Sequence, residues 1–196
     1  MQDGPEDPYT TETGAGEQWY AAYTKHQHEK SAASLLEKKG FEILLPLYRT
    51  VHRWKDRMQP VALPVFPCYV FIRANLERKL AILQTPGIFW LLGNSGNAAV
   101  VPDADIEAIR KITTSPAVYE AHPYLKSGDR VRVISGAIAG VEGVLTRVKN
   151  RYRVVLSVDL LQQALAVEVD IATVERIAPA KQEGAQPALR SKSMKV

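Results

Sequence analysis

The chain has 196 residues, of which 46% are hydrophobic and 23% are charged, so it can bury a core and is neither disordered throughout nor fibrous. No apolar run approaches the roughly 18 residues that a membrane-spanning helix needs, and residues 1–17 hold no apolar segment typical of a signal peptide. We therefore expect a cytoplasmic protein without a membrane partner. Cys68 is the only cysteine, which excludes an intrachain disulfide.

The net charge of +4 is unevenly distributed along the chain. Residues 1–18 carry five acids and no base, whereas residues 179–196 carry four bases and one acid. Both segments are poor in large apolar residues, so we predict a disordered acidic leader and a disordered basic tail. The region between them is basic, which permits a polyanionic partner such as a nucleic acid.

The first predicted domain covers residues 19–116 and interleaves strands with helices. The sequence Thr24-Lys25-His26-Gln27 fits the capping-box pattern for the start of a helix that ends at Lys39-Gly40. Hydrophobic periodicity predicts the other elements: strands over 19–23, 41–47, 64–73 and 88–92, a long hairpin over 48–64, a short helix capped by Asn75, and a helix over 103–113. This order predicts an α+β sandwich and not parallel βαβ units.

The second predicted domain covers residues 128–178 and is all β. Two prolines, Pro116 and Pro123, bracket a segment without periodicity, so residues 117–127 are predicted to be an interdomain linker. Five short runs separated by turn residues predict strands that form a small barrel: 130–134, 143–149, 152–158, 164–169 and 173–176.

The strand predicted over 64–73 has two apolar faces. Phe66, Val70 and Ile72 point one way by period-two alternation, and Tyr69 and Phe71 point the other way. We expect helices to cover one face. The other face either packs under a second layer or is an exposed patch that marks a protein interface.

The segment from Gly128 to Leu145 combines alternating valines with closely spaced glycines and resembles the KOW motif. Ala137-Ile138 stand where many KOW segments have Pro-Phe. The alternative interpretation is a glycine-rich hairpin in an unrelated small barrel.

Four motifs of the first domain occur in the order of the NusG N-terminal (NGN) domain: WYxxY at 19–23, LPLY at 45–48, FPCYVF at 66–71 and PGI at 86–88. With the KOW segment behind them, the resemblance covers residues 19–178. The chain is identified as a member of the NusG family, most similar to its specialised paralogs of the RfaH and UpxY type. The resemblance implies an NGN sandwich with a mainly antiparallel sheet, followed by an SH3-like KOW barrel.

The resemblance also implies a partner. In this family the NGN domain binds the β′ clamp helices of RNA polymerase through an aromatic cavity, which Tyr23, Tyr69 and Phe71 would line by motif position. From the residues alone, the favoured interpretation is that all three are ordinary core aromatics.

The predicted hairpin is rich in bases. Period-two alternation puts Arg49, Arg53, Lys55 and Arg57 on one face and His52 and Trp54 on the other, as in a surface that binds phosphates and stacks bases. The alternative is a solvated hairpin. The resemblance adds Lys25 and Lys38 as contacts to upstream or non-template DNA.

In the barrel, Leu161 matches the position that presents an apolar residue to Rho or to a small-subunit ribosomal protein; the alternative is a loop anchor of the barrel. The sequence has no Walker-type phosphate loop and no G-x-S-x-G, and the spacing of His26 and His28 completes no metal site. We therefore expect no enzyme, no cofactor and no metal.

Together these features predict a monomeric transcription elongation and antitermination factor that increases the processivity of RNA polymerase. Two alternatives stay open: a housekeeping NusG that couples polymerase to Rho or the ribosome, and a KOW-type protein that binds RNA or ribosomes without polymerase.

Overall fold

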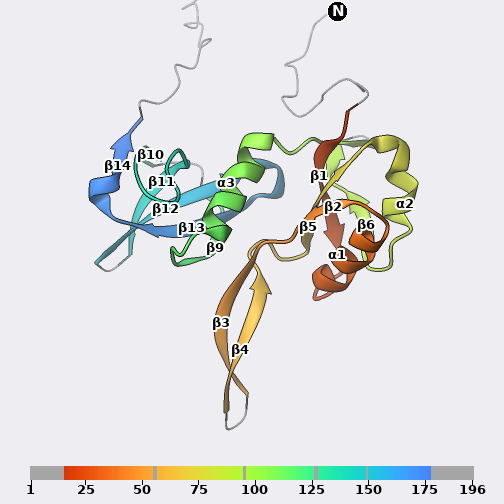
Figure 1. The fold of residues 1–196 in the computed structure, drawn as a ribbon, viewed down its shortest axis with the longest axis horizontal. Coiled ribbons are helices and arrows are strands. Elements are labelled where there is room, and N and C mark those ends of the chain that lie inside the picture. Colours follow the sequence, from red (N-terminus) through yellow and green to blue (C-terminus); the bar gives the residue numbers. More distant parts are fainter. Residues whose placement is uncertain (1–15, 55–56, 95, 126–127, 149, 178–196) are drawn as a thin grey trace, which may run out of the picture.

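The computed structural model describes residues 16–54, 57–94, 96–125, 128–148 and 150–177, with only the backbone described at residues 52–54. The predicted leader and tail therefore lie almost entirely outside the described residues. Two domains lie side by side, with α3 between them and the β3–β4 hairpin projecting away from both (Figure 1). No helix in the described ranges is long and apolar enough to cross a membrane.

The N-terminal domain is built on a four-stranded sheet with the order β2-β5-β1-β6. All of its pairs are antiparallel, which confirms the predicted α+β class. Its strands are β1 (Gln18–Thr24), β2 (Glu42–Leu44), β5 (Tyr69–Ala74) and β6 (Ile88–Leu91). The remaining elements are α1 (Glu29–Lys38), β3 (Leu47–Trp54), β4 (Arg57–Pro64), η1 (Leu76–Arg78), α2 (Lys79–Leu83), β7 (Gly93–Asn94), β8 (Asn97–Ala98) and α3 (Asp103–Thr114).

Helices α1 and α2 cover one face of this sheet. Val70 and Ile72 of β5 pack there with Leu36 of α1, as the alternation predicts. The prediction is wrong for Phe66, which precedes β5 and packs in the other cluster with Phe71. The predicted end of α1 is confirmed: Gly40 has φ +80°, and its N–H bonds to the carbonyl of Glu37 while the N–H of the following residue bonds to that of Leu36. These two bonds form a Schellman motif that satisfies the last carbonyls of the helix.

The predicted capping box is wrong. Thr24 ends β1 and its N–H bonds to the carbonyl of Cys68, so strand pairing already uses this residue. Gln27 then turns the chain with φ +63°, and α1 starts two residues later behind His28, whose side chain makes no capping hydrogen bond.

Two strand predictions need shortening. The strand predicted over 64–73 starts only at Tyr69, because residues 65–68 form a turn in which Cys68 has φ +67°. The strand predicted over 41–47 ends at Leu44, and the chain enters the hairpin at Leu47.

The C-terminal domain contains a six-stranded antiparallel sheet with the order β14-β10-β11-β12-β13-β9. The five predicted strands are present as β10 (Arg130–Val133), β11 (Glu142–Val148), β12 (Arg151–Val158), β13 (Gln163–Val169) and β14 (Val174–Arg176), with η2 (Asp159–Leu161) and η3 (Ile171–Thr173) between them. The sixth strand corrects the linker prediction: β9 (Tyr119–Pro123) lies inside predicted linker 117–127 and pairs along β13. The domain boundaries themselves stay a prediction.

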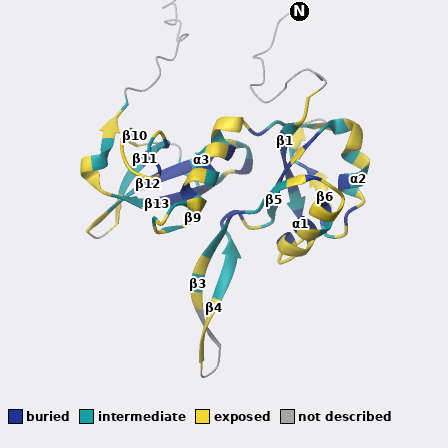
Figure 2. Cartoon of the chain, in the orientation of Figure 1, coloured by how far each residue is buried: buried dark blue, intermediate teal, exposed yellow. Residues whose placement is uncertain are grey.

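The second face of the N-terminal sheet packs under a second layer, which was one of the two predicted outcomes. One apolar cluster joins Trp19 and Phe71 of this sheet to Ile109 of α3 and to Leu156 and Leu165 of the C-terminal domain. The dark-blue residues of both domains in Figure 2 accordingly gather on either side of α3. Because burial of apolar surface is the main favourable term in association, this shared core holds the two domains together.

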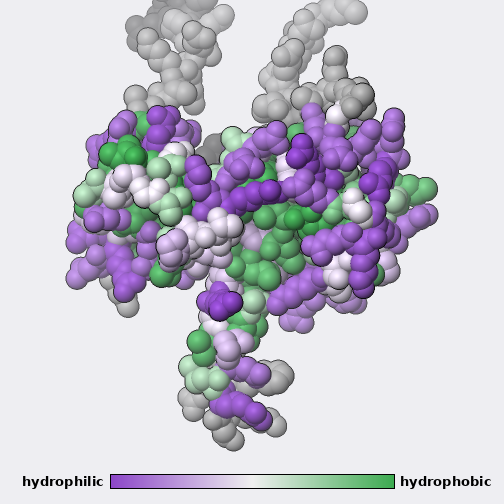
Figure 3. Space-filling view, in the orientation of Figure 1, coloured by the Kyte–Doolittle hydropathy of each residue, from purple (hydrophilic) through white to green (hydrophobic). Residues whose placement is uncertain are grey.

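Polar contacts reinforce the shared core. Lys111 of α3 donates from Nζ to the carbonyl of Ala139 at 2.8 Å, and the Tyr119 hydroxyl donates to the carbonyl of Leu47 at 2.8 Å. On the face shown in Figure 3, apolar surface gathers between the domains and at the root of the hairpin. The C-terminal domain is therefore docked on the N-terminal domain in this structure.

Candidate protein-binding surface

Three aromatic residues occupy one rung across three neighbouring strands. In the strand register, Tyr23 of β1 lies opposite Tyr69 of β5 on one side and opposite Trp90 of β6 on the other. Directly opposed residues of antiparallel strands share a face of the sheet and lie within side-chain contact. The sheet therefore gathers three rings from segments that are far apart in the sequence.

The rings contact one another closely. Tyr23 stacks on Trp90 with centroids 4.5 Å apart and planes at 16°, and it meets Tyr69 edge-on with centroids 5.4 Å apart. Phe89 completes the group at 6.1 Å from Tyr23. These distances lie in or near the range in which aromatic pairs attract one another. We call Tyr23, Tyr69, Phe89 and Trp90 the aromatic surface.

The aromatic surface is open to solvent at β6. Phe89 and Trp90 are 55% and 52% exposed, whereas Tyr23 and Tyr69 are half-buried beside them. Sequence reasoning identified both tyrosines but missed Phe89 and Trp90. The only signal was the adjacent aromatic pair inside the strand predicted over 88–92, and nothing local shows that this strand pairs with β1.

Phe71, the third residue predicted to line this surface, lies on the same face of the sheet but inside the core. Its side chain is fully buried and packs edge-on against Phe66 at 5.5 Å, within the core that both domains share. In the docked structure Phe71 therefore supports the sheet and does not reach solvent.

The turn before β5 borders the aromatic surface. The N–H of Cys68 donates to Oε1 of buried Glu29 at 2.9 Å, which ties the turn to the first turn of α1. Burial, and secondly the Glu29 carboxylate, raises the pKa of the Cys68 thiol, while a hydrogen bond with Tyr23 acts in the opposite direction. Burial also raises the pKa of Tyr69, so its hydroxyl stays neutral and can donate to a partner.

The structure separates the two lysines predicted to contact DNA. Lys25 precedes α1 and Lys38 lies in its last turn, so the ten-residue helix, about 15 Å long, separates them. Both are exposed.

The predicted basic face of the hairpin is wrong for Arg57. The register of β3 and β4 puts Arg57 opposite Trp54 and puts Arg49 opposite Ala62. Residues 49 and 54 are an odd number of positions apart in β3, so they lie on opposite faces of the hairpin. Arg57 shares the face of residue 54, which it pairs with, and therefore lies on the face opposite Arg49. Period-two counting failed because it ran past the end of β3 at Trp54. Lys55 and the side chains of Arg53 and Trp54 lie outside the described part.

Leu161 is buried in the docked structure. It lies in η2, is 4% exposed and belongs to the apolar cluster that spans both domains. Two residues further, Gln163 donates from Nε2 to the carbonyl of Pro67 at 3.3 Å. The predicted partner-binding loop of the C-terminal domain therefore lies at the domain interface.

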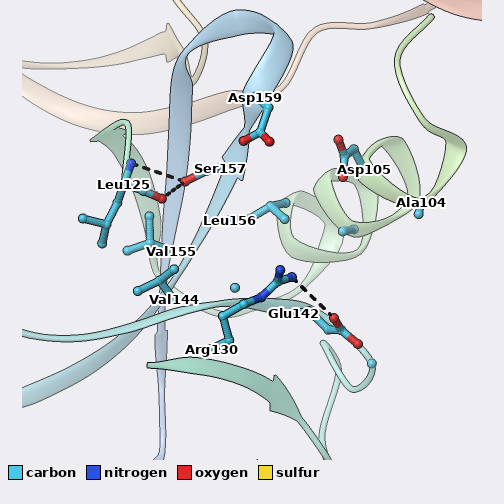
Figure 4. Close-up of a pocket in the computed structure, with 13 residues that line it drawn as sticks. Ala104, Asp105, Leu125, Arg130, Glu142, Val144, Val155, Leu156, Ser157 and Asp159 are labelled. Atoms are coloured by element: carbon cyan, nitrogen blue, oxygen red, sulfur yellow. Dashed lines mark hydrogen bonds and ion pairs between the residues drawn. The ribbon is translucent and has the colours of Figure 1, made fainter. Parts of the chain in front are cut away.

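A cleft of about 600 Å³ opens between α3 and the C-terminal sheet (Figure 4). Asp105 of α3 and Asp159 of η2 lie on opposite sides of it, and Arg130 pairs with Glu142 at its floor. Burial, and secondly the charge of Asp159, raises the pKa of Asp105 to about 6. A raised pKa means that the docked structure disfavours the charged carboxylate, so ionisation of Asp105 weakens docking of the two domains.

Comparison with known proteins identifies the N-terminal domain. The family model described as "NusG: Transcription termination factor nusG" matches residues 17–110, which contain the whole aromatic surface. The match covers just under half of the chain, and over these residues the chain is similar to the NusG family. The matched family consists of non-enzymatic transcription factors, which agrees with the expectation that this chain is not an enzyme.

Two curated proteins match this chain along most of its length. Both are named "Transcription termination/antitermination protein NusG". The Thermus thermophilus protein is 27% identical over 178 residues, covering 80% of this chain and 97% of the relative. The Lactococcus lactis protein is 29% identical over 172 residues, covering 81% and 92%.

The fold is also similar to a solved structure, described as "Domain interaction in Thermotoga maritima NusG". The TM-score is 0.53 with 21% sequence identity, and the match covers 83% of this chain and 98% of the other. This likeness supports the fold.

Proposed function

We propose that this chain is a transcription elongation and antitermination factor that binds RNA polymerase at the β′ clamp helices through the aromatic surface. The observation that carries the proposal is the row of aromatic side chains across three strands, in which Tyr23 contacts both Tyr69 and Trp90. It lies in the domain that matches the family model.

The chemistry of this surface suits a protein partner. Tyrosine and tryptophan carry much of the binding energy at protein interfaces, because they bury large apolar area with few rotatable bonds. The sheet holds these rings in place before a partner arrives, so little conformational entropy is lost on binding. Phe89 and Trp90 supply the exposed apolar area, and the Tyr69 hydroxyl supplies a hydrogen-bond donor.

Binding, and not catalysis, is the proposed mode of action. A protein held on the polymerase clamp stabilises the elongating state by occupying it, since a ligand favours whichever state it binds better. Upstream or non-template DNA is a second proposed contact, through exposed Lys25, Lys38, Arg49 and Arg57 and through Arg53, Trp54 and Lys55, whose side chains the structure does not describe. Phosphate contacts of this kind are independent of sequence and weaken with salt.

Within the family we propose a specialised paralog of the RfaH and UpxY type. Support comes from the Ala137-Ile138 step in the KOW segment and from the basic hairpin. Housekeeping NusG remains the competing assignment.

Leu161 is the proposed contact to Rho or to a small-subunit ribosomal protein. Because its side chain is 4% exposed, such a partner reaches it only after η2 leaves the domain interface. Docking and partner binding at Leu161 are therefore mutually exclusive in this proposal.

Purification of the tagged full chain from cells tests the proposal. Co-elution of the β and β′ subunits of RNA polymerase, retained after nuclease treatment, is the expected result. Ribosomal subunits without polymerase would instead indicate a KOW-type RNA- or ribosome-binding protein.

A further inference from the structure

The fold brings together three side chains of the types that ligate metals, although the sequence spacing predicts no metal site. His26 comes from the loop after β1, Glu29 from the first turn of α1 and Cys68 from the turn before β5. One ligand atom of each lies within 4.8 Å of those of the other two, and Cys68 Sγ lies 3.8 Å from His26 Nδ1. Residues 26 and 68 are 42 apart in the chain, so only the tertiary fold reveals this cluster.

The backbone around the cluster is in a rarely populated conformation. Three non-glycine residues in the described ranges have positive φ; Cys68 is one of them at +67°, and Gln27, which follows His26, is another at +63°. Residues with a Cβ rarely adopt this region, and such outliers concentrate at functional sites. A cysteine in place of the glycine that this backbone favours indicates that its side chain has a role.

The third ligand is already held in place. Glu29 is 3% exposed, and its Oε1 accepts the N–H of Cys68 at 2.9 Å. A carboxylate has two oxygens, so coordination through one does not require loss of this hydrogen bond. The carboxylate therefore fixes the turn that carries the thiol and offers a ligand in the same place.

We propose that His26, Glu29 and Cys68 bind a divalent metal ion of the zinc type. Thiolate, imidazole and carboxylate are all zinc ligands, and three protein ligands leave a fourth position for water. In tetrahedral zinc sites the sulfur and nitrogen ligands lie about 3.5 Å apart, as follows from usual bond lengths, so the observed Sγ–Nδ1 separation of 3.8 Å needs only a small adjustment. Binding converts the Cys68 thiol to thiolate and releases its proton to solvent.

The proposed metal would fix the turn beside the aromatic surface. Cys68 directly precedes Tyr69, and the turn it belongs to also carries Pro67, which accepts the hydrogen bond from Gln163. The metal site does not depend on the proposed polymerase binding, and its test uses the purified chain alone.

Titration of the full chain with Co²⁺, a spectroscopic substitute for Zn²⁺, tests the site. Because the chain has one cysteine, a thiolate-to-cobalt charge-transfer band in the near ultraviolet can come only from Cys68. We expect one Co²⁺ per monomeric chain, displaced by one Zn²⁺. Absence of the band at micromolar metal, or half a metal per chain in a dimer, overturns the proposal.

Variants separate a three-residue site from a thiol that binds metal by itself. Cys68→Ser should abolish the band, and His26→Ala and Glu29→Gln should each weaken Co²⁺ binding at least tenfold, whereas the control His122→Ala should leave it unchanged. His26 is exposed, so its variant should fold even if the Glu29 variant does not. Unchanged Co²⁺ affinity in folded His26→Ala contradicts the proposed site.

Discussion

Gln163 of the C-terminal domain donates a hydrogen bond to the carbonyl oxygen of Pro67 in the N-terminal domain, 3.3 Å away. This contact places the start of β13 against the turn that leads into Tyr69. It lies beside an apolar cluster to which both domains contribute. The position of the C-terminal domain is thereby linked to the edge of the aromatic surface.

Removing the polar contacts between the domains should weaken docking. The double variant Lys111→Ala, Gln163→Ala loses two hydrogen bonds to backbone carbonyls, each worth about 1 kcal/mol net. NMR relaxation should then show the two domains tumbling more independently. Lys79→Ala, which loses a comparable bond to Gly96 within the N-terminal domain, is the control. Independent tumbling already in the unaltered protein would contradict the docked structure.

Docking should depend on pH through Asp105. Its pKa is raised from 3.8 to about 6 in the docked structure, so this structure binds the proton more tightly than the undocked or unfolded chain does. Stability contributed by this group therefore falls as pH rises from about 4 through 6. Asp105→Asn should raise the melting temperature at about pH 7.5 and change it much less at about pH 4.

Asp103→Asn is the matched control for this prediction. Asp103 lies in the same first turn of α3 but is exposed. A melting-temperature gain in Asp103→Asn equal to that in Asp105→Asn would show that the helix dipole, and not the cleft, is responsible.

Phe71 should matter for stability. Its ring is fully buried, so Phe71→Ala removes core contacts and leaves a cavity, at a cost of about 3–5 kcal/mol in the free energy of unfolding. Phe89→Ala, on a 55% exposed ring, should cost well under 1 kcal/mol. Denaturant unfolding measures both; similar small losses would show that Phe71 is not part of the core.

The hairpin arginines should contribute to nucleic-acid affinity without reading sequence. If Arg49 and Arg57 each contact a phosphate, each alanine variant should reduce the slope of log affinity against log salt by about one. Because the two arginines lie on opposite faces of the hairpin, a duplex that contacts a single face should show the reduced slope for only one of the two variants. Fluorescence anisotropy of a labelled duplex, titrated with each variant at several salt concentrations, measures these slopes, with Arg176→Ala as the control. The slopes show whether one face of the hairpin, both faces or neither contacts the duplex.

Local patterns in the sequence predicted the local features of the fold. Gly40 ends α1 because only a left-handed residue completes the Schellman bonds, and Val70 and Tyr69 face opposite ways because strand side chains alternate. The hairpin was likewise predicted within about one residue of its observed strands.

Features that depend on distant pairing were not predictable from the sequence. Trp90 joins the aromatic surface only because β6 pairs with β1, and residues 119–123 form a strand only because β13 offers them an edge. The cluster of His26 with Cys68 arises in the same way. In each case the deciding contact spans 40 residues or more, and no local propensity encodes it.

The central claim is that the aromatic surface binds RNA polymerase, and titration of the double variant Tyr23→Ala, Trp90→Ala against core polymerase tests it most directly. Loss of two stacked interface rings, at about 1.5 kcal/mol or more each, should weaken binding roughly 100-fold or more. The control Ile134→Ala, at a residue as exposed as Trp90 but in the C-terminal domain, should bind normally. Unchanged affinity in a correctly folded double variant would contradict the claim.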